Sequence, residues 1–255
     1  MTQLFSGRKY KKSLQNLILQ LPNLTENHPI LIATFNNPTY LKMMVDQIRA
    51  KDLGPIIILD SHSTNPEMLS VLKDYESQGI GVLRFTENVG PRFLLKSSLI
   101  KVMPNNFILT DPDLKLSTDF SKEHLNYFVQ LSEMQRIGKV GCTLSIKDSQ
   151  LFRPDIFFRG MSIYDWENQF WQNQLECNDD VIAYTAIIDT TFAMYNKKYF
   201  KKRFLYSAIR VDKIRGKDVS ARHLPWYIKT DVPADEIKNY TLLSQPDGIP
   251  TWGIG

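Results

Sequence analysis

The chain has 255 residues, of which 43% are hydrophobic and 23% charged, and its net charge is +4. These values are those of an ordinary globular protein and exclude a disordered or collagen-like chain, and the longest apolar runs, such as residues 55–59, are too short to cross a bilayer. The mild charge, without a visible basic stripe interleaved with aromatics, predicts no nucleic-acid partner, and Cys142 and Cys177 form no zinc or disulfide motif.

The N-terminal segment combines a basic cluster, residues 7–12, with apolar residues at helical spacing: Leu14, Leu17, Ile18 and Leu21. A basic amphipathic helix of this kind can lie on an anionic membrane. More often such a helix packs on its own domain. No signal-peptide pattern precedes it, so we expect a cytoplasmic protein, with peripheral membrane contact left open.

Strands and helices then alternate along the first half of the chain. Pro38 and Pro66, each preceded by an asparagine cap, start two helices, and Gly79 ends the second. Such alternation predicts an α/β fold with a mainly parallel sheet covered by helices on both faces. The predicted strands are residues 30–35, 55–59, 80–85 and 106–110, and the predicted helices are residues 36–50, 64–79 and 91–103.

The loops that leave these four strands are polar, and all four should lie at one edge of the sheet. In such sheets a ligand binds outside the carboxyl ends of the strands, near a switch in strand order. Asn37 and Asn65 are read as helix caps only, whereas Gly90 lets backbone approach a ligand closely. The candidate nucleotide contacts in these loops are Thr34, Asn36, Asp60, Ser61, Ser63, Asn88, Gly90, Arg92 and Asp111.

Carboxylates stand at the ends of two of the strands. Asp60 follows the second strand, and Asp111 and Asp113 follow the fourth in the sequence Thr-Asp-Pro-Asp, in a loop expected to be exposed. Asp-Pro-Asp is also turn chemistry, so the motif alone decides nothing. Beside a nucleotide-sized crevice, however, such hard oxygen ligands suit Mg²⁺ or Mn²⁺ bridging a diphosphate.

The second half of the chain is less regular. Residues 139–146 and 183–200 are read as strands, and residues 162–174 as a short aromatic helix. Asp189 falls in the middle of the second of these strands, where a buried carboxylate is costly unless paired or functional. His223 stands in the late segment Arg-His-Leu-Pro-Trp-Tyr and, taken alone, is more often structural than a ligand.

Eight short motifs follow one another within residues 29–253: TFNNPTYL, LDSHSTNPEML, ENVGPR, TDPDL, KVGCTLSI, DWENQFW, IDTTFAMY and RHLPWY. Together they resemble a GT-A glycosyltransferase of family 2, in a bacterial-type branch. The resemblance implies a nucleotide-sugar half, residues 29–138, and an acceptor half, residues 139–255, within a single domain that residues 1–28 extend. It also implies that Asp60 contacts base or ribose and that Asp111 and Asp113 bind metal and diphosphate. His223 would complete the metal site.

The chain departs from the family pattern at two points. It has Asp-Ser-His-Ser where Asp-Asp-Gly-Ser is typical, and it lacks the Glu-Asp pair that houses the general base. An inverting enzyme needs a base at the acceptor hydroxyl, and Asp189 is the first candidate, before Asp165 and Glu167. The nearby Trp166 and Trp171 either stack on a sugar or pack in the core.

The leading hypothesis is a metal-dependent glycosyltransferase of polysaccharide biosynthesis that uses a UDP-, GDP- or dTDP-sugar. Its acceptor would be a glycan or lipid-linked hydroxyl. Inversion is the expected outcome, and retention stays open because the usual Glu-Asp pair is missing. One alternative is a sugar nucleotidyltransferase, although residues 34–40 lack the glycine-rich phosphate loop of such enzymes. Another is a non-catalytic sugar- or nucleotide-binding module, which would have no use for a base.

Overall fold

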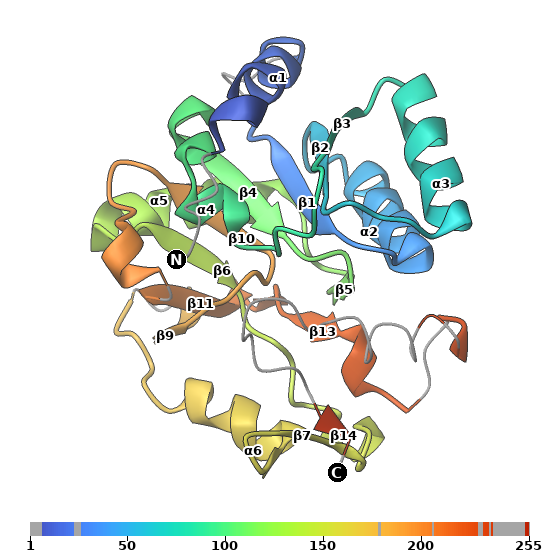
Figure 1. The fold of residues 1–255 in the computed structure, drawn as a ribbon. Coiled ribbons are helices and arrows are strands. Elements are labelled where there is room, and N and C mark those ends of the chain that lie inside the picture. The colour runs from blue at the N-terminus through green and yellow to red at the C-terminus, as the bar shows by residue number, and fades with distance from the viewer. Residues whose placement is uncertain are drawn as a thin grey trace.

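The computed structural model describes residues 7–22, 27–177, 180–205, 207–228, 232–234, 236 and 253–254. A nine-stranded sheet forms the centre of this described part (Figure 1). Its strands follow the order β12-β11-β6-β10-β4-β1-β2-β3, with β9 paired to β11. No helix within the described ranges is long and apolar enough to cross a membrane.

The first four strands are parallel, as the alternating pattern predicts. They are β1 (Ile30–Thr34), β2 (Ile56–Asp60), β3 (Gly81–Arg84) and β4 (Asn106–Thr110). The chain runs from β1 outward through β2 to β3 and then returns to place β4 on the other side of β1. The switch in strand order therefore lies between β1 and β4, which is where an α/β sheet opens its binding crevice.

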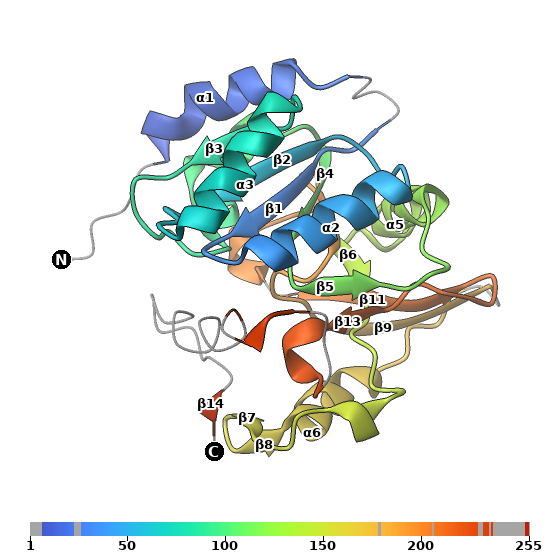
Figure 2. The same cartoon turned by 90° about the vertical axis from the view of Figure 1, so that its right-hand side faces the viewer.

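Helices cover both faces of the sheet (Figure 2). Because side chains alternate along a strand, Ile30 and Ile32 join the core under α2 (Pro38–Ala50), α3 (Pro66–Ser77) and α5 (Lys122–Gln135). Leu31 and Ala33 face the opposite core, under α1 (Arg8–Leu19), α4 (Phe93–Lys96) and the 3₁₀ segment η1 (Ser98–Val102). The α/β prediction with a helix-flanked sheet is confirmed.

The second half of the chain completes the same sheet. The strands β6 (Lys139–Cys142), β9 (Val181–Ile187), β10 (Ala193–Asn196), β11 (Ser207–Ile214) and β12 (Lys217–Asp218) all belong to it. The strand β10 lies between β4 and β6 and is antiparallel to both.

Smaller elements complete the fold, and α6, β7 and β14 lie in the lower part of the molecule in Figure 1. A separate ribbon pairs β5 (Leu114–Leu116) with β13 (Ala221–His223), which leads into the 3₁₀ segment η5 (Leu224–Trp226). A second small sheet joins β7 (Ile156–Phe158), β8 (Met161–Ser162) and β14 (Gly253–Ile254). The remaining segments are α6 (Ile163–Asn168), η2 (Ser149–Leu151), η3 (Gln169–Trp171) and η4 (Lys202–Phe204).

Three predicted elements were wrong in extent. Residues 183–200 are not one strand, because the chain turns at residues 188–192 between β9 and β10. The predicted helix 91–103 is interrupted at Ser97, which is extended and accepts a hydrogen bond from the Leu99 amide. The predicted strand 139–146 ends at Cys142.

Candidate active site

The carboxyl ends of β1, β2 and β4 bring Thr34, Asp60 and the Asp111 loop to one edge of the sheet. The loops after β1 and β2 are joined directly there. Asn36, at a left-handed φ of 52°, accepts hydrogen bonds from the amides of Thr64 and Asn65 at 2.8 and 2.9 Å. The backbone amide of Asn36 donates to the Ser63 hydroxyl. Asn36 therefore holds the two loops together as one surface.

The Asp60 carboxylate is fully buried and already has protein partners. The Ser63 backbone amide donates to both carboxylate oxygens at 3.2 Å, and Arg84 Nε donates to Oδ2 at 3.0 Å. Arg84 also donates to the Ser63 carbonyl. In this conformation Asp60 organises the turn after β2, and its role toward a base or ribose stays a prediction.

The start of α2 is capped from a distant part of the chain. Asn37 occupies the cap position, but its side chain accepts from the Thr34 hydroxyl and makes no capping bond. The buried Glu236 carboxylate accepts from the amides of Thr39 and Tyr40 at 3.0 and 3.2 Å instead. No local pattern in the sequence indicates this cap, because its partners lie almost 200 positions apart. Asn65, by contrast, caps α3 through the Met68 amide as predicted.

The remaining predicted contacts lie in the same set of loops. The Ser61 amide donates to the Thr34 carbonyl, and the Asn88 side chain accepts from the amide of Gly90, whose φ is 71°. Arg92 follows and is largely buried. One guanidinium nitrogen of Arg92 lies 3.6 Å from Asp189 Oδ2. A cationic side chain is thus held beside the acidic end of β4.

Asp111 is fastened to the turn between β9 and β10. Its amide donates to the Thr190 carbonyl at 3.0 Å, and the Thr190 hydroxyl donates to Asp111 Oδ2. Burial and the adjacent Asp113 raise the pKa of the Asp111 carboxyl well above its usual value, which the Thr190 hydrogen bond and the Arg92 charge oppose. The paired carboxylates are therefore electrostatically costly as they stand.

Asp113 meets His223 through the pairing of β5 with β13. In that register His223 stands opposite Leu114, the residue after Asp113, and the Leu224 amide donates to the Asp113 carbonyl. Asp113 Oδ2 lies 3.2 Å from His223 Nε2, and the histidine ring packs 4.7 Å from Trp226. The expectation of an exposed Asp113 was wrong, because only 2% of the residue is accessible.

The Asp113 carboxylate and the His223 imidazole are groups that can bind a small divalent cation, and the distance between them suits one. Two ligands about 2.1 Å from such an ion and at right angles are about 3 Å apart, close to the separation between Asp113 and His223. The carboxylate oxygens suit Mn²⁺ or Mg²⁺, whereas imidazole is a ligand of transition metals, so the mixed set of donors favours Mn²⁺. Among the described residues, no three His, Cys, Asp or Glu side chains are already grouped as a metal site. Asp111 is the candidate third ligand.

The three base candidates occupy different environments. Asp189 lies in the turn after β9, and its side chain is 49% exposed, so the prediction that it is buried inside a strand was wrong. Asp165 is also exposed and binds Ser162 at the start of its own helix. Glu167 is buried and ion-paired with Arg210, and burial raises its pKa to about 7 although Arg210 opposes this.

Lys139 supports the turn that carries Asp189, and sequence reasoning missed it. Its side chain is buried, and Nζ donates to the carbonyls of Ile188 and Leu205 at 2.7 Å and of Asp189 at 3.3 Å. Burial lowers the pKa of the Lys139 ammonium to about 7, against the attraction of Asp189. The only sequence signal was a lysine at the start of an apolar strand.

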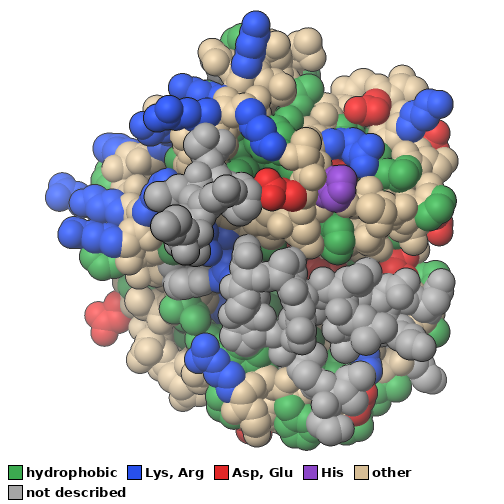
Figure 3. All heavy atoms as spheres, in the orientation of Figure 1, with side chains coloured by type: hydrophobic (Ala, Val, Ile, Leu, Met, Phe, Trp, Pro, Cys, Tyr) green, Lys and Arg blue, Asp and Glu red, His purple; other side chains and the backbone are tan. Residues whose placement is uncertain are grey.

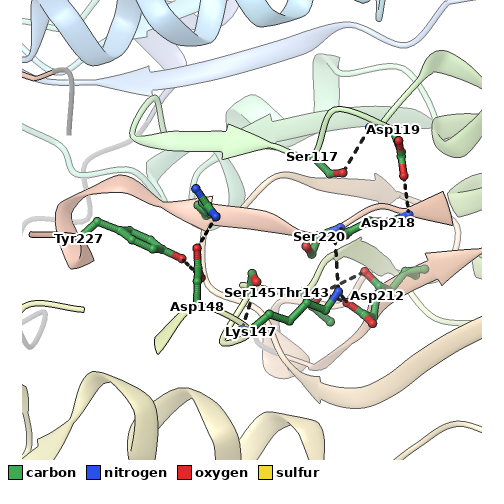
Figure 4. A network of polar contacts seen from close by, with 12 residues as sticks. Ser117, Asp119, Thr143, Ser145, Lys147, Asp148, Asp212, Asp218, Ser220 and Tyr227 are labelled. Carbon is green, nitrogen blue, oxygen red and sulfur yellow. Dashed lines mark hydrogen bonds and ion pairs between the residues drawn. The ribbon is translucent and has the colours of Figure 1, made fainter. Parts of the chain in front are cut away.

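A polar network holds the strand that carries His223 (Figure 4). Lys147 Nζ contacts Asp212 at 3.0 Å and Asp218 at 3.3 Å, which ties the loop after β6 to β11 and β12. Asp148 accepts from the Tyr227 hydroxyl at 2.9 Å and pairs with Arg222. These contacts fix both ends of the segment from Asp218 to Tyr227, so His223 is positioned by side chains from the second half of the chain.

The two tryptophans of the aromatic helix are both packed against other rings. The ring centre of Trp166 lies 4.1 Å from that of Phe158 and 5.5 Å from that of Phe170. The ring centre of Trp171 lies 5.2 Å from that of Tyr184. Both are partly buried. These contacts favour packing over sugar stacking as their role.

No protein family and no curated protein matches the sequence. Among solved structures, the chain is similar to a mannosyltransferase from Pyrobaculum calidifontis in complex with GDP-Man and Mn²⁺ (TM-score 0.46, 14% identity, covering 80% of this chain and 61% of that one). It is also similar to S. aureus TarS 1-349 in complex with UDP-GlcNAc (0.43, 12%, 71% and 48%) and to a putative glucose-1-phosphate thymidylyltransferase from Bacillus anthracis (0.39, 12%, 67% and 72%). This chain therefore spans less than two thirds of the length of the first two of these proteins.

Proposed function

We propose that this chain is a metal-dependent glycosyltransferase of the GT-A type that moves a sugar from a nucleoside-diphosphate sugar to an acceptor hydroxyl. The observation that carries the proposal is the meeting of Asp113 with His223, 110 positions apart, beside Asp111 at the switch point of the sheet. A structural turn after β4 has no need of an imidazole from the far end of the chain. A divalent ion held there would neutralise the leaving diphosphate.

The chain's own residues would divide the remaining work. Arg92, held beside Asp111 and Asp189, would contact the donor diphosphate, and the joined loops after β1 and β2 would seat the nucleoside. Asp189 is the base that we propose, because its carboxylate is exposed at this edge whereas Glu167 is enclosed. If Asp189 takes the proton from the acceptor hydroxyl while its oxygen attacks the anomeric carbon and the nucleoside diphosphate leaves from the opposite side, this single displacement inverts the anomeric centre.

The proposed acceptor is a glycan or a lipid-linked hydroxyl, and the process is polysaccharide biosynthesis. Peripheral membrane contact through the exposed basic side chains of α1 is part of this proposal, because its buried face, with Tyr10, Leu14 and Ile18, already packs on the domain. The charged face is therefore the one left for a partner.

The test is a screen of UDP-, GDP- and dTDP-sugars for release of nucleoside diphosphate with Mn²⁺ or Mg²⁺. Asp113→Asn and His223→Gln, which keep side-chain size, should abolish the release and also the thermal stabilisation by Mn²⁺ plus nucleotide. Asp165→Asn, in an exposed local cap, is the matched control and should keep both. Activity that is indifferent to EDTA and to Asp113→Asn would contradict the metal role.

Two further readouts separate the alternatives. Pyrophosphate release from a nucleoside triphosphate and a sugar 1-phosphate would identify a nucleotidyltransferase, and tight donor binding without turnover would identify a binding module. The anomeric configuration of the product distinguishes inversion from retention. Retention would exclude Asp189 as the base.

A further inference from the structure

One face of the molecule gathers lysine and arginine side chains from three separate parts of the chain. In Figure 3 these blue side chains lie over α1, over the segment of α4 and η1, and over η4. We call this surface the basic face. Its members are Arg8, Lys9, Lys11, Lys12, Lys96, Lys101, Lys197, Lys198, Lys201, Lys202 and Arg203. Ten of these eleven residues are exposed, and Lys197 is half-buried.

The basic face separates charge across the molecule. Of the 29 lysines and arginines that the structure describes, 18 lie outside the basic face, whereas the same described residues include 22 aspartates and glutamates. Among the described residues the net charge outside this face is therefore negative, and Glu133 pairs with only one of its members, Lys198. A concentrated patch of this kind attracts a polyanionic surface, whereas evenly mixed charges serve solubility alone.

Contacts between the three segments make the basic face one fixed surface. Lys202 Nζ donates to the carbonyls of Lys96 and Ser97 at 2.6 and 3.2 Å, and Lys197 Nζ donates to the Lys101 carbonyl at 3.4 Å. These bonds fasten the loop after β10 to α4 and η1. In turn, α1 packs on η1 through the buried Leu14 and Leu99. The charges keep their spacing because the segments beneath them are packed.

An apolar side chain stands among these charges. Phe204 is 53% exposed, and the Arg203 guanidinium lies 4.7 Å from its ring centre. The other two aromatic residues of the loop are occupied, because Phe200 packs 5.5 Å from Tyr195 and the Tyr199 hydroxyl donates to Glu133. Binding of single-stranded nucleic acid usually combines a basic groove with several open aromatic platforms, whereas a single apolar ring among cations suits insertion into a lipid interface.

We propose that the basic face docks on an anionic lipid bilayer, with Phe204 entering the headgroup region and the lysines and arginines lying against anionic headgroups. This docking surface extends well beyond α1, because the loop of residues 197–204 and the α4–η1 segment contribute most of its members. The inference depends on the surface alone and holds whichever reaction the sheet edge performs.

The test is co-sedimentation of the full chain with vesicles of phosphatidylcholine alone or containing about one third phosphatidylglycerol. Binding should require the anionic lipid and fall steeply between about 0.1 M and 1 M salt. Lys201→Gln combined with Arg203→Gln should weaken vesicle binding roughly tenfold or more, since each cation near a membrane surface contributes separately. Phe204→Ser should weaken the binding that persists at high salt.

Lys73→Gln combined with Lys217→Gln is the matched control, because both residues are exposed, removal of both changes the net charge equally, and neither belongs to the basic face. This control should bind vesicles as the parent does. Equal losses in the two double variants, or equal binding to neutral vesicles, would overturn the proposal. Binding to single-stranded RNA that depends on Lys201 and Arg203, without vesicle binding, would overturn it in favour of nucleic acid.

Discussion

A carboxylate acts on an acceptor hydroxyl only where the acceptor can reach it, and Asp189 and Glu167 differ in this respect. Asp189 should be replaceable by asparagine without loss of stability, with kcat falling roughly 10²–10⁴-fold if it is the base. Glu167→Gln would leave Arg210 buried without a charged partner, which should lower the free energy of unfolding by about 3–5 kcal/mol. Steady-state kinetics and chemical denaturation of both variants measure the two effects. A stable Glu167→Gln variant with little activity would reverse the assignment.

Asp60 provides a second prediction for a single side chain. Asp60→Ala removes the acceptor for the Ser63 amide and the partner of Arg84, so the free energy of unfolding should fall by about 1–3 kcal/mol. Asp60→Asn keeps an acceptor oxygen and is the control that should lose less. Thermal melts and nucleotide titrations of the parent and both variants measure the change in stability and the change in nucleotide affinity. Unchanged melting with a large loss of nucleotide affinity would return Asp60 to direct contact with the ligand.

Single residues also show what sequence reasoning can place. Asp111 and Asp113 were expected at the sheet edge because the strand ends of a parallel sheet converge there, and His223 was chosen from the family resemblance. The structure brings Asp113 and His223 together, and their role as metal ligands stays a prediction. Asp189 was selected because an acid inside a strand is costly, but the turn at residues 188–192 removes that cost. The reason was wrong, although the residue does lie at the predicted edge.

Among the elements, the turn between β9 and β10 depends on Lys139, and this gives a prediction for pH. The pKa of Lys139 is about 7 in the folded protein and near 10.5 when unfolded, so the unfolded chain binds more protons between these values. The free energy of unfolding should therefore rise with pH from about 7 toward 10.5 through this residue. Lys139→Met should lack that rise and be less stable, since three carbonyls lose their donor.

The measurement is the pH dependence of chemical denaturation for the parent and for Lys139→Met. Lys147→Met is the control. Burial lowers the pKa of Lys147, but the carboxylates of Asp212 and Asp218 raise it by more, so its pKa lies above the usual value. A parallel pH dependence of stability in the parent and in Lys139→Met would show that Lys139 stays charged throughout. The turn would then be held by a permanent cation.

Elements were predictable where one local pattern decides them. The strands β1, β2 and β4 are short buried apolar runs between turn signals, and α2 and α3 begin with Asn-Pro. The helix α5 has buried residues but no proline or glycine boundary, and it was missed. The strand β11 was missed as well, because its register with β6 and β9 depends on partners far away in the chain.

For the whole molecule, topology decides what no local pattern contains. Glu236 binds the start of α2, which joins a late part of the chain to an early one, and the contact of Asp113 with His223 joins a late part of the chain to its middle. The basic face is likewise assembled from three segments, of which the sequence identified only the first. Charges that are distant in the sequence become one surface because α1 packs on η1 and Lys202 of η4 donates to the carbonyls of Lys96 and Ser97.

The position of β10 also determines when folding can finish. Until residues 193–196 leave the ribosome, β4 has an unpaired edge, and β6 has no partner through which to join the first four strands. The first half alone would therefore present the amides and carbonyls of residues 106–110 to other chains, which is a template for aggregation. A nascent chain of this protein is expected to need chaperone protection late in synthesis, and a gene split between the two halves should yield soluble protein only when both pieces are made together.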